Sequence, residues 1–269
     1  VLTYHSDVVR QQFLLSVYRP LMRRYLGAMD RIVATSPNYF ATSEVLQEFA
    51  DKVAVIPIGL DEPSYPALDE CNRDLAPAAA RYGRDFFLFV GVLRYYKGLH
   101  ILLDAVKDAP YNVVIVGAGP VEAELREQAL RLGLDNVVFA GFVSDREKMA
   151  LFQLCRAVVF PSYLRSEAFG VTLLEGAMSA RPLISAEVGS GTSHVNIHGE
   201  TGLVVPPGDS VALRAAMDEL YSDERKARAM GERARQRYET LFTGRGMGEQ
   251  YAAIYAEVQA ENNTSEPRQ

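Results

Sequence analysis

The clearest pattern in the chain is an alternation of short, continuous apolar runs with segments of helical periodicity. The apolar runs predict strands at residues 86–92, 112–116, 137–140, 157–160, 182–185 and 202–205. The periodic segments predict helices at about 97–108, 121–132, 145–154, from Gly170 onward, 210–221 and 224–239. Buried strands that alternate with amphipathic helices indicate a parallel sheet covered on both faces, so we predict an α/β fold.

The region before this alternation contains a smaller set of the same elements. Strands are predicted at residues 1–4, 31–36 and 53–58, and helices at 8–29 and 37–49. Pro20 should break or kink the first of these helices. Between residues 61 and 84 the pattern dissolves among prolines and alanines, which indicates a linker and a domain boundary. A last helix is predicted at 246–259, before a polar tail.

Composition and charge narrow the class of protein. The 269 residues are 48% hydrophobic and 23% charged, which is typical of a globular protein. The net charge of −6 argues against a nucleic-acid binder, which is usually basic. The sequence has no apolar run of about 18 residues that would predict a spanning helix, and no recognisable signal peptide. Because the chain opens on Val1 within a predicted strand, we expect an N-terminal truncation.

The cysteines and histidines carry little chemical signal. Cys71 and Cys155 lie far apart without a CxxC motif, so two thiols in a reducing cytosol are favoured over a disulfide. The four histidines show no spacing typical of metal ligands.

Two carboxylates, Glu167 and Glu175, flank a glycine after the predicted strand 157–160. Glu167 should lie on the loop that leaves the strand, and Glu175 in the first turns of the helix that begins at about Gly170. Both side chains can then face the start of that helix. A helix N-terminus offers free N–H groups and the positive end of a dipole, which suit a phosphate. The segment is therefore a candidate grip for a sugar nucleotide.

Gly91 and Gly98 bracket a second candidate loop, which carries Arg94 and Lys97 at a strand-to-helix junction. Two cations there suit a diphosphate, with Arg94 as a fork and Lys97 as a point charge. Ordinary surface cations on a solvated loop are the alternative.

The remaining strand ends give weaker signals. Residues 117–120 suggest a dinucleotide site, but Glu122 takes the place of the third glycine of GxGxxG, so a tight turn with close helix packing explains them better. Gly141, followed by the apolar Phe142 and Val143, can place backbone groups against a flat base, with a core role as the alternative. The glycine-rich residues 189–202 can form the floor of a nucleotide pocket, although turn chemistry also explains them. His5, after the first strand, is a candidate base, with a structural role as the alternative.

Together these motifs resemble those of a glycosyltransferase of the GT-B fold, family GT4, of the bacterial surface-polysaccharide mannosyltransferase type. The likeness extends over nearly the whole chain and is most specific at residues 91–98 and 161–175. The resemblance implies three parts. Residues 1–60 would be the end of an acceptor-side Rossmann-like domain, residues 61–245 a nucleotide-sugar-binding Rossmann-like domain, and residues 246–269 a helix and tail that pack back toward the first domain.

The resemblance also implies roles for individual residues. Arg94 and Lys97 would bind the donor diphosphate and stabilise the leaving group, and Glu167 would contact the donor sugar. Glu175 would bind the ribose hydroxyls, while His5 would reach the donor sugar across the cleft. The other donor-binding positions would be Gly91, then Phe142 and Val143 at the border of the base, and Phe169, Gly170, Val171 and Thr172 at the turn.

The activity implied is a retaining transfer of a hexose, mannose by preference, from GDP-mannose or a UDP-sugar, without a metal. The acceptor would be a glycan or a lipid-linked glycan in surface polysaccharide biosynthesis, in the cytoplasm. The helix at 8–29 carries Arg10, Arg19, Arg23 and Arg24, and could contact the inner face of the membrane. A core helix with a solvated arginine face is the alternative.

Other functions fit the residues less well. A nucleotide-sugar 2-epimerase of the same fold would need further acid and base groups, of which the sequence shows no clear set. A nucleotide-sugar-binding fragment without turnover is also an alternative, although the intact Arg94, Lys97, Glu167 and Glu175 argue against loss of catalysis. An NAD-dependent oxidoreductase lacks its glycine fingerprint. One departure from the family is Ile58, beside Gly59, where a polar residue is usual.

Overall fold

The chain folds around two parallel sheets in a computed structural model that describes residues 1–5, 12–66 and 68–265. The smaller sheet has the order β1-β2-β3, with β1 at Leu2–Tyr4, β2 at Ile32–Ala34 and β3 at Val53–Val55. The larger sheet has the order β6-β5-β4-β7-β8-β9. Its strands are β4 (Phe87–Val90), β5 (Val113–Val116), β6 (Val137–Gly141), β7 (Ala157–Phe160), β8 (Leu183–Ala186) and β9 (Gly202–Val205).

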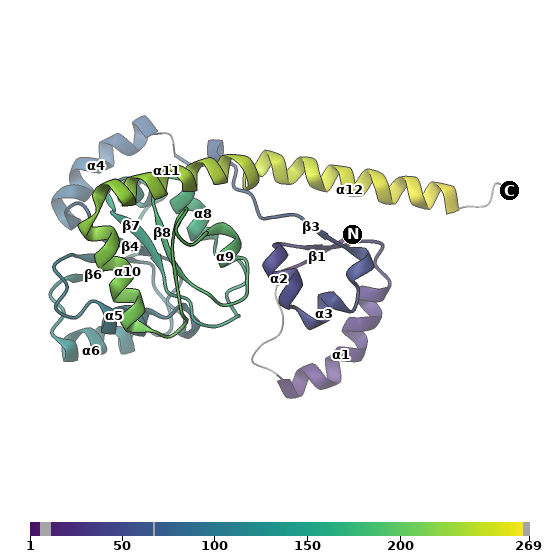
Figure 1. Cartoon of the computed structure of the whole chain (residues 1–269), viewed down its shortest axis with the longest axis horizontal. Coiled ribbons are helices and arrows are strands. Elements are labelled where there is room, and N and C mark those ends of the chain that lie inside the picture. The colour runs from purple at the N-terminus through teal and green to yellow at the C-terminus, as the bar shows by residue number, and fades with distance from the viewer. Residues whose placement is uncertain (6–11, 67, 266–269) are drawn as a thin grey trace.

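Helices connect the strands and cover the sheets (Figure 1). Around the smaller sheet they are α1 (Gln12–Gly27), α2 (Pro37–Thr42), α3 (Glu44–Gln47) and α12 (Gly244–Ser265). Around the larger sheet they are α4 (Leu68–Tyr82), α5 (Leu99–Ala105), α6 (Glu122–Leu132), α7 (Asp145–Leu154), α8 (Val171–Met178), α9 (Thr192–Val195), α10 (Ser210–Ser222) and α11 (Glu224–Leu241). Short 3-10 turns lie at Ala50–Lys52, Glu62–Ser64 and Tyr95–Lys97.

The larger sheet has an apolar core on each face because its strands are apolar at nearly every position. Leu88 and Val90 of β4 pack with helices α4, α7 and α8, whereas Phe87 and Phe89 pack with α5, α6 and α10. All four residues of β4 are buried. Side chains alternate between the faces of a strand, so a run without polar residues supplies both layers. The expected doubly covered parallel sheet is confirmed.

The expectation of an irregular linker over residues 61–84 is wrong, because α4 occupies Leu68–Tyr82. Ala78 and Tyr82 of this helix are buried in the core that α7 also lines. Pro77 is inside the helix but exposed, so the carbonyl that it leaves unpaired can bind water. The connection between the two parts is therefore short. It contains the 3-10 turn Glu62–Ser64, which includes Pro63, and then Pro66.

Two helices of the first part differ from what their sequences predict. Pro20, expected to break or kink the first helix, does not break it, since α1 continues to Gly27, and Pro20 is exposed. The single helix expected at 37–49 is divided into α2 and α3 at Ser43, whose side chain accepts a hydrogen bond from the backbone N–H of Leu46. A serine that caps a new helix start ends the preceding one.

The chain passes between the two sheets twice, along neighbouring paths. The backbone N–H of Leu60 donates to the Phe242 carbonyl at 2.8 Å, and that of Gly244 donates to the Leu60 carbonyl at 2.7 Å. Beyond this point α12 extends over the smaller sheet (Figure 1), where Ile254 and Val258 pack with Val33 of β2. None of the described helices combines the length and the apolarity that a membrane span requires.

Candidate functional site

The order of strands in the larger sheet determines where a ligand can bind. β4 and β7 are neighbours, with β5 and β6 on one side and β8 and β9 on the other. The connections after β4 and β7 therefore leave in opposite directions and open a crevice beyond the carboxyl ends of these two strands. Residues 91–98 follow β4 and residues 161–170 follow β7, so the two most specific sequence motifs lie side by side at this crevice.

The two loops are held together by backbone contacts. Gly98 has φ +70°, and a Cβ atom there would lie 2.0 Å from the Pro161 carbonyl oxygen. The backbone N–H of Tyr163 donates to the Tyr96 carbonyl at 3.1 Å. The Thr172 hydroxyl, in the first turn of α8, donates to the Val90 carbonyl at 3.0 Å. The end of β4 is thereby tied to both the loop and the helix that follow β7.

Glu167 is a buried carboxylate that is 8% exposed. The Lys97 Nζ atom lies 2.5 Å from its Oε2 oxygen, and the Ser162 hydroxyl donates to the same oxygen at 3.0 Å. Lys97 also lies over the Phe160 ring, 4.6 Å from its centroid. Within the described part of the chain, no hydrogen bond reaches the second oxygen, Oε1. The ion pair thus fixes the carboxylate and leaves one oxygen for a ligand.

Glu175 repeats this arrangement on the second turn of α8 and is 6% exposed. The Lys148 Nζ atom of α7 donates to Oε1 at 2.9 Å, and the Tyr65 hydroxyl donates to the same oxygen at 3.3 Å. Burial lowers the pKa of Lys148, but the Glu175 and Asp145 carboxylates outweigh burial and raise it. Burial and the Glu175 charge raise the pKa of Tyr65, so its hydroxyl remains a donor. Oε2 accepts no hydrogen bond from the described residues.

Lys148, Tyr65 and Ser162 were not among the residues predicted from the sequence. Lys148 lies in an ordinary amphipathic helix, and Tyr65 lies in the segment that the sequence presented as a linker. Ser162 falls inside a recognised motif, between Pro161 and Glu167, and its position could have suggested it. The other two carry no spacing signal, because only the packing of α7 and the connection brings them to Glu175.

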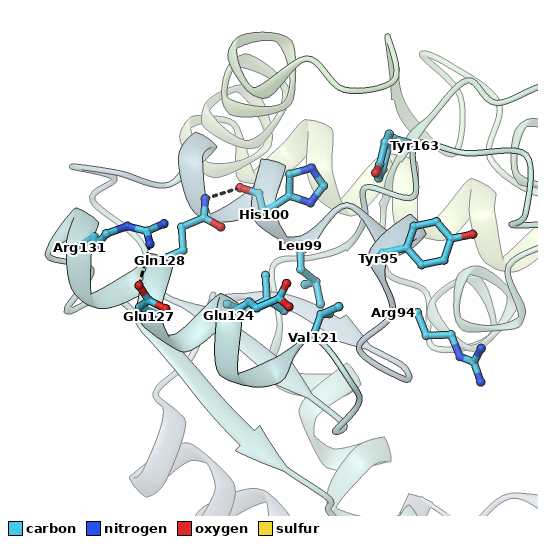
Figure 2. Close-up of a pocket in the computed structure, with 11 residues that line it drawn as sticks. Arg94, Tyr95, Leu99, His100, Val121, Glu124, Glu127, Gln128, Arg131 and Tyr163 are labelled. Atoms are coloured by element: carbon cyan, nitrogen blue, oxygen red, sulfur yellow. Dashed lines mark hydrogen bonds and ion pairs between the residues drawn. The ribbon is translucent and has the colours of Figure 1, made fainter. Parts of the chain in front are cut away.

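Arg94 is exposed. Among the described residues, Glu167 forms its ion pair with Lys97 and not with Arg94. It borders a pocket of about 340 Å³ between α5 and α6, which is lined by Tyr95, Leu99, His100, Val121, Glu124, Leu125, Glu127, Gln128, Arg131 and Tyr163. Figure 2 shows the Arg94 guanidinium pointing away from the α6 residues of this pocket. The structure therefore separates the two cations of this loop, one paired with a carboxylate and one exposed.

The remaining predicted residues have different surroundings. Gly170 has φ +90° before α8, Val171 is 45% exposed, and Phe169 is buried against Phe242 with ring centroids 6.2 Å apart. Phe142 is 86% exposed and Val143 is partly buried, after the edge strand β6. His5 is exposed after β1, and no contact joins it to Glu167. Gly91 ends β4 with φ +152°.

Gly117 and Gly119 have a structural explanation. A Cβ atom on Gly117 would lie 2.1 Å from the Gly91 carbonyl oxygen, and one on Gly119 would lie 2.3 Å from that of Leu93. These glycines therefore allow the turn after β5 to pack against the loop after β4. The close packing expected from the sequence is present, although the partner is a neighbouring loop and not a helix.

The chain is similar in sequence to known glycosyltransferases. The family model "Glycosyl transferases group 1" matches residues 73–237. The chain is 58% identical over 243 residues to the D-rhamnosyltransferase WbpZ of Pseudomonas aeruginosa, covering 90% of this chain and 63% of that protein. It is 52% identical over 255 residues to the O-antigen chain mannosyltransferase C of Escherichia coli, covering 95% of this chain and 68% of that protein.

Solved structures show the same fold. The Anabaena protein Alr3699/HepE, in complex with UDP and glucose, is 22% identical with a TM-score of 0.80, covering 95% of this chain and 71% of that chain. A sucrose-phosphate synthase from Thermosynechococcus elongatus is 27% identical with a TM-score of 0.81, covering 97% of this chain and 68% of that chain. The expected GT-B fold is confirmed.

We predict that Gly98→Ala separates the loops after β4 and β7. The variant combines left-handed strain of roughly 1–2 kcal/mol with a clash against the Pro161 carbonyl. The control is Gly133→Ala, because Gly133 has φ +67° and an added Cβ would have no neighbour within 4 Å. Denaturant unfolding should show a larger loss of stability for Gly98→Ala. Equal losses would mean that the contact with Pro161 does not constrain the loops.

Proposed function

Because the chain belongs to the glycosyl transferases group 1 family, we propose that it is a retaining hexosyltransferase that uses a nucleotide-diphosphate sugar. The observation that carries the proposal is the pair of anchored carboxylates, Glu167 and Glu175, beside Lys97 at the β4–β7 crevice. The nucleotide sugar would bind to the part at residues 61–245. Residues 1–60 would contribute to the acceptor side, and residues 246–269 would join the two.

The donor that we favour is GDP-mannose, with a UDP-sugar as the alternative. An O-antigen chain mannosyltransferase and a D-rhamnosyltransferase are both more than 50% identical to this chain over the aligned residues, which supports a hexose donor. The acceptor would be a glycan or a lipid-linked glycan. The chain spans 63% of the length of the D-rhamnosyltransferase, so these substrates are proposed from similarity over that part alone.

Each charged residue would have a distinct task in the transfer. Glu175 would accept hydrogen bonds from the ribose hydroxyls through its second oxygen, and Glu167 would do the same for the donor sugar. As the bond between the sugar and the diphosphate breaks, negative charge grows on the leaving phosphate. Lys97, together with Arg94 after reorientation of its side chain, would stabilise this charge. The transfer would then need no metal ion. Gly170 and the first N–H groups of α8 would lie nearest the phosphates.

A panel of nucleotides tests the proposed donor site. GDP should raise the midpoint of thermal unfolding by more than ADP does, because a ligand that binds only the folded state stabilises it by about 2.7 kcal/mol at a hundredfold excess over Kd. A larger rise of the unfolding midpoint with UDP than with GDP would identify a UDP-sugar as the donor. Stabilisation by none of the three nucleotides would contradict the proposal.

Removing either member of the Lys97–Glu167 pair should abolish most transfer. We expect Lys97→Ala and Glu167→Gln each to reduce kcat by roughly 10²–10³, as loss of one preorganised charge does at other sites. The assay is release of GDP from GDP-mannose in the presence of a lipid-linked glycan acceptor. Lys107→Ala, an exposed lysine on the same domain, serves as the control.

Stability separates a catalytic effect from a folding effect. Lys97→Ala alone leaves a buried carboxylate unpaired, at a cost of about 3–5 kcal/mol, whereas the double variant with Glu167→Gln removes both charges. The double variant should recover stability and remain inactive. Activity near that of the parent protein in any of these variants would contradict the assigned roles.

A peripheral contact with an anionic membrane is the finer part of the proposal. Tyr18, Leu21 and Tyr25 lie three or four residues apart on α1 and are 50%, 63% and 55% exposed. Arg24 is exposed on the same helix, while Arg19 and Arg23 pair with Glu44 and Glu48. An exposed apolar stripe beside arginines is typical of a helix that lies on a membrane surface.

Replacing these three apolar residues together with serine should abolish co-sedimentation with phosphatidylglycerol vesicles. Leu130→Ser is the matched control, because Leu130 is 82% exposed on α6 of the other sheet. If the parent protein does not sediment with the vesicles at low salt, the membrane contact is wrong, while the transferase proposal is unaffected.

A further inference from the structure

We propose that Lys148 and Tyr65 are positioning residues that hold Glu175 in the orientation needed to bind the ribose of the donor nucleotide. The inference rests on the proposed role of Glu175 as a ribose ligand. Neither residue would touch the reacting atoms. Each would act through the carboxylate, and neither belongs to the sequence motifs that identify the family.

Both donors bind the same oxygen of Glu175. Lys148 Nζ lies 2.9 Å from Oε1, and the Tyr65 hydroxyl lies 3.3 Å from it. A carboxylate with one saturated oxygen cannot rotate without losing both hydrogen bonds. Its second oxygen is then directed at a fixed point, where it can accept from a hydroxyl of a ligand.

Burial makes these donors necessary. The side chain of Glu175 is 8% exposed and that of Lys148 is 18% exposed, so the pair lies largely out of water. A carboxylate that leaves water needs a partner of opposite charge and hydrogen bonds in return. Lys148 supplies both to Glu175, while Asp145, 3.2 Å from the ammonium, helps to hold the lysine.

A similar hydrogen-bonding arrangement at Glu167 supports this interpretation. There too a lysine and a hydroxyl donor, Lys97 and Ser162, converge on one oxygen and leave the other open. Two carboxylates with seven residues between them in the sequence are thus anchored in the same way by residues from different elements. A requirement for oriented carboxylates at both positions explains the repetition, whereas stability alone would not require a free oxygen at each.

Tyr65 comes from the segment that joins the two sheets. It lies between the 3-10 turn Glu62–Ser64 and α4, on the connection between the two sheets. Glu62 of that turn is paired with Arg235 of α11, at 2.7 Å. The connection is thereby fixed to the larger sheet, and Tyr65 reaches Glu175 from a fixed position. The segment that joins the two parts also helps to build the nucleotide site.

The test compares the affinity of the whole chain for GDP and for 2′,3′-dideoxy-GDP by calorimetry, and likewise for the two corresponding uridine nucleotides. The parent protein should bind the ribonucleotide roughly ten- to hundredfold more tightly, the range expected for hydrogen bonds to a charged group. Lys148→Met and Tyr65→Phe should weaken binding of the ribonucleotide and leave that of the dideoxynucleotide unchanged. Lys148→Arg should restore most of the preference.

Control variants separate positioning from general destabilisation. Lys226→Met removes an exposed ion pair with Glu219, and Tyr221→Phe removes a hydroxyl that donates to the Pro110 carbonyl. Both should keep the full preference for the ribonucleotide. Glu175→Gln should lose it and gives the lower limit for the comparison.

Three results would overturn the inference. The first is an unchanged preference in Lys148→Met and Tyr65→Phe when Glu175→Gln has lost it. The second is an equal loss of affinity for both nucleotides, which indicates a structural role only. The third is a parent protein that binds both nucleotides equally, which removes Glu175 as a ribose ligand but leaves the transferase proposal standing. A parent protein that binds no nucleotide would instead contradict the proposed function itself.

Discussion

The candidate site depends on the burial of two carboxylates beside the ends of parallel strands. A carboxylate that leaves water loses its solvation and must gain both charge compensation and hydrogen bonds in return. At Glu167 and at Glu175 this compensation comes from one lysine and one hydroxyl, and both bind a single oxygen. The arrangement supplies both forms of compensation while one oxygen stays open, so the contacts that burial requires also leave an acceptor for a ligand.

Bringing these groups together requires close backbone contacts that only glycine allows. The turn after β5 packs on the loop after β4 through Gly117 and Gly119, and that loop packs on Pro161 through Gly98. The connections after the three neighbouring strands β5, β4 and β7 are thus stacked at the carboxyl edge of the sheet. Lys97, on the loop after β4, and Glu167, on the loop after β7, then lie within reach of each other. The role of Gly117 and Gly119 in close packing therefore agrees with the preference for a tight turn over a dinucleotide fingerprint.

The sequence predicted the larger sheet well because its strands are short and almost continuously apolar, as in 157–160, which β7 matches residue for residue. It did not predict α4, because two prolines before the helix and Pro77 inside it hid an alanine-rich buried face. Lys97 and Glu167 could be selected as candidates from their motifs, but their pairing could not. Lys148 and Tyr65 lie outside any motif, and only tertiary packing brings them to Glu175.

The connection between the sheets takes part both in the contacts between the two parts and in the site. Leu60 pairs with Phe242 and Gly244 where the chain crosses twice, and Tyr65 contacts Glu175 five residues later. On the other side, the Thr42 hydroxyl of α2 donates to the Gly189 carbonyl at 2.6 Å, and Arg165 donates to the same carbonyl. A rotation of the smaller sheet against the larger one would strain contacts at both places. Tyr65 lies beyond these contacts, on a connection that the Glu62–Arg235 pair fixes to the larger sheet, so its hydrogen bond to Glu175 belongs to the larger-sheet part and does not depend on the position of the smaller sheet.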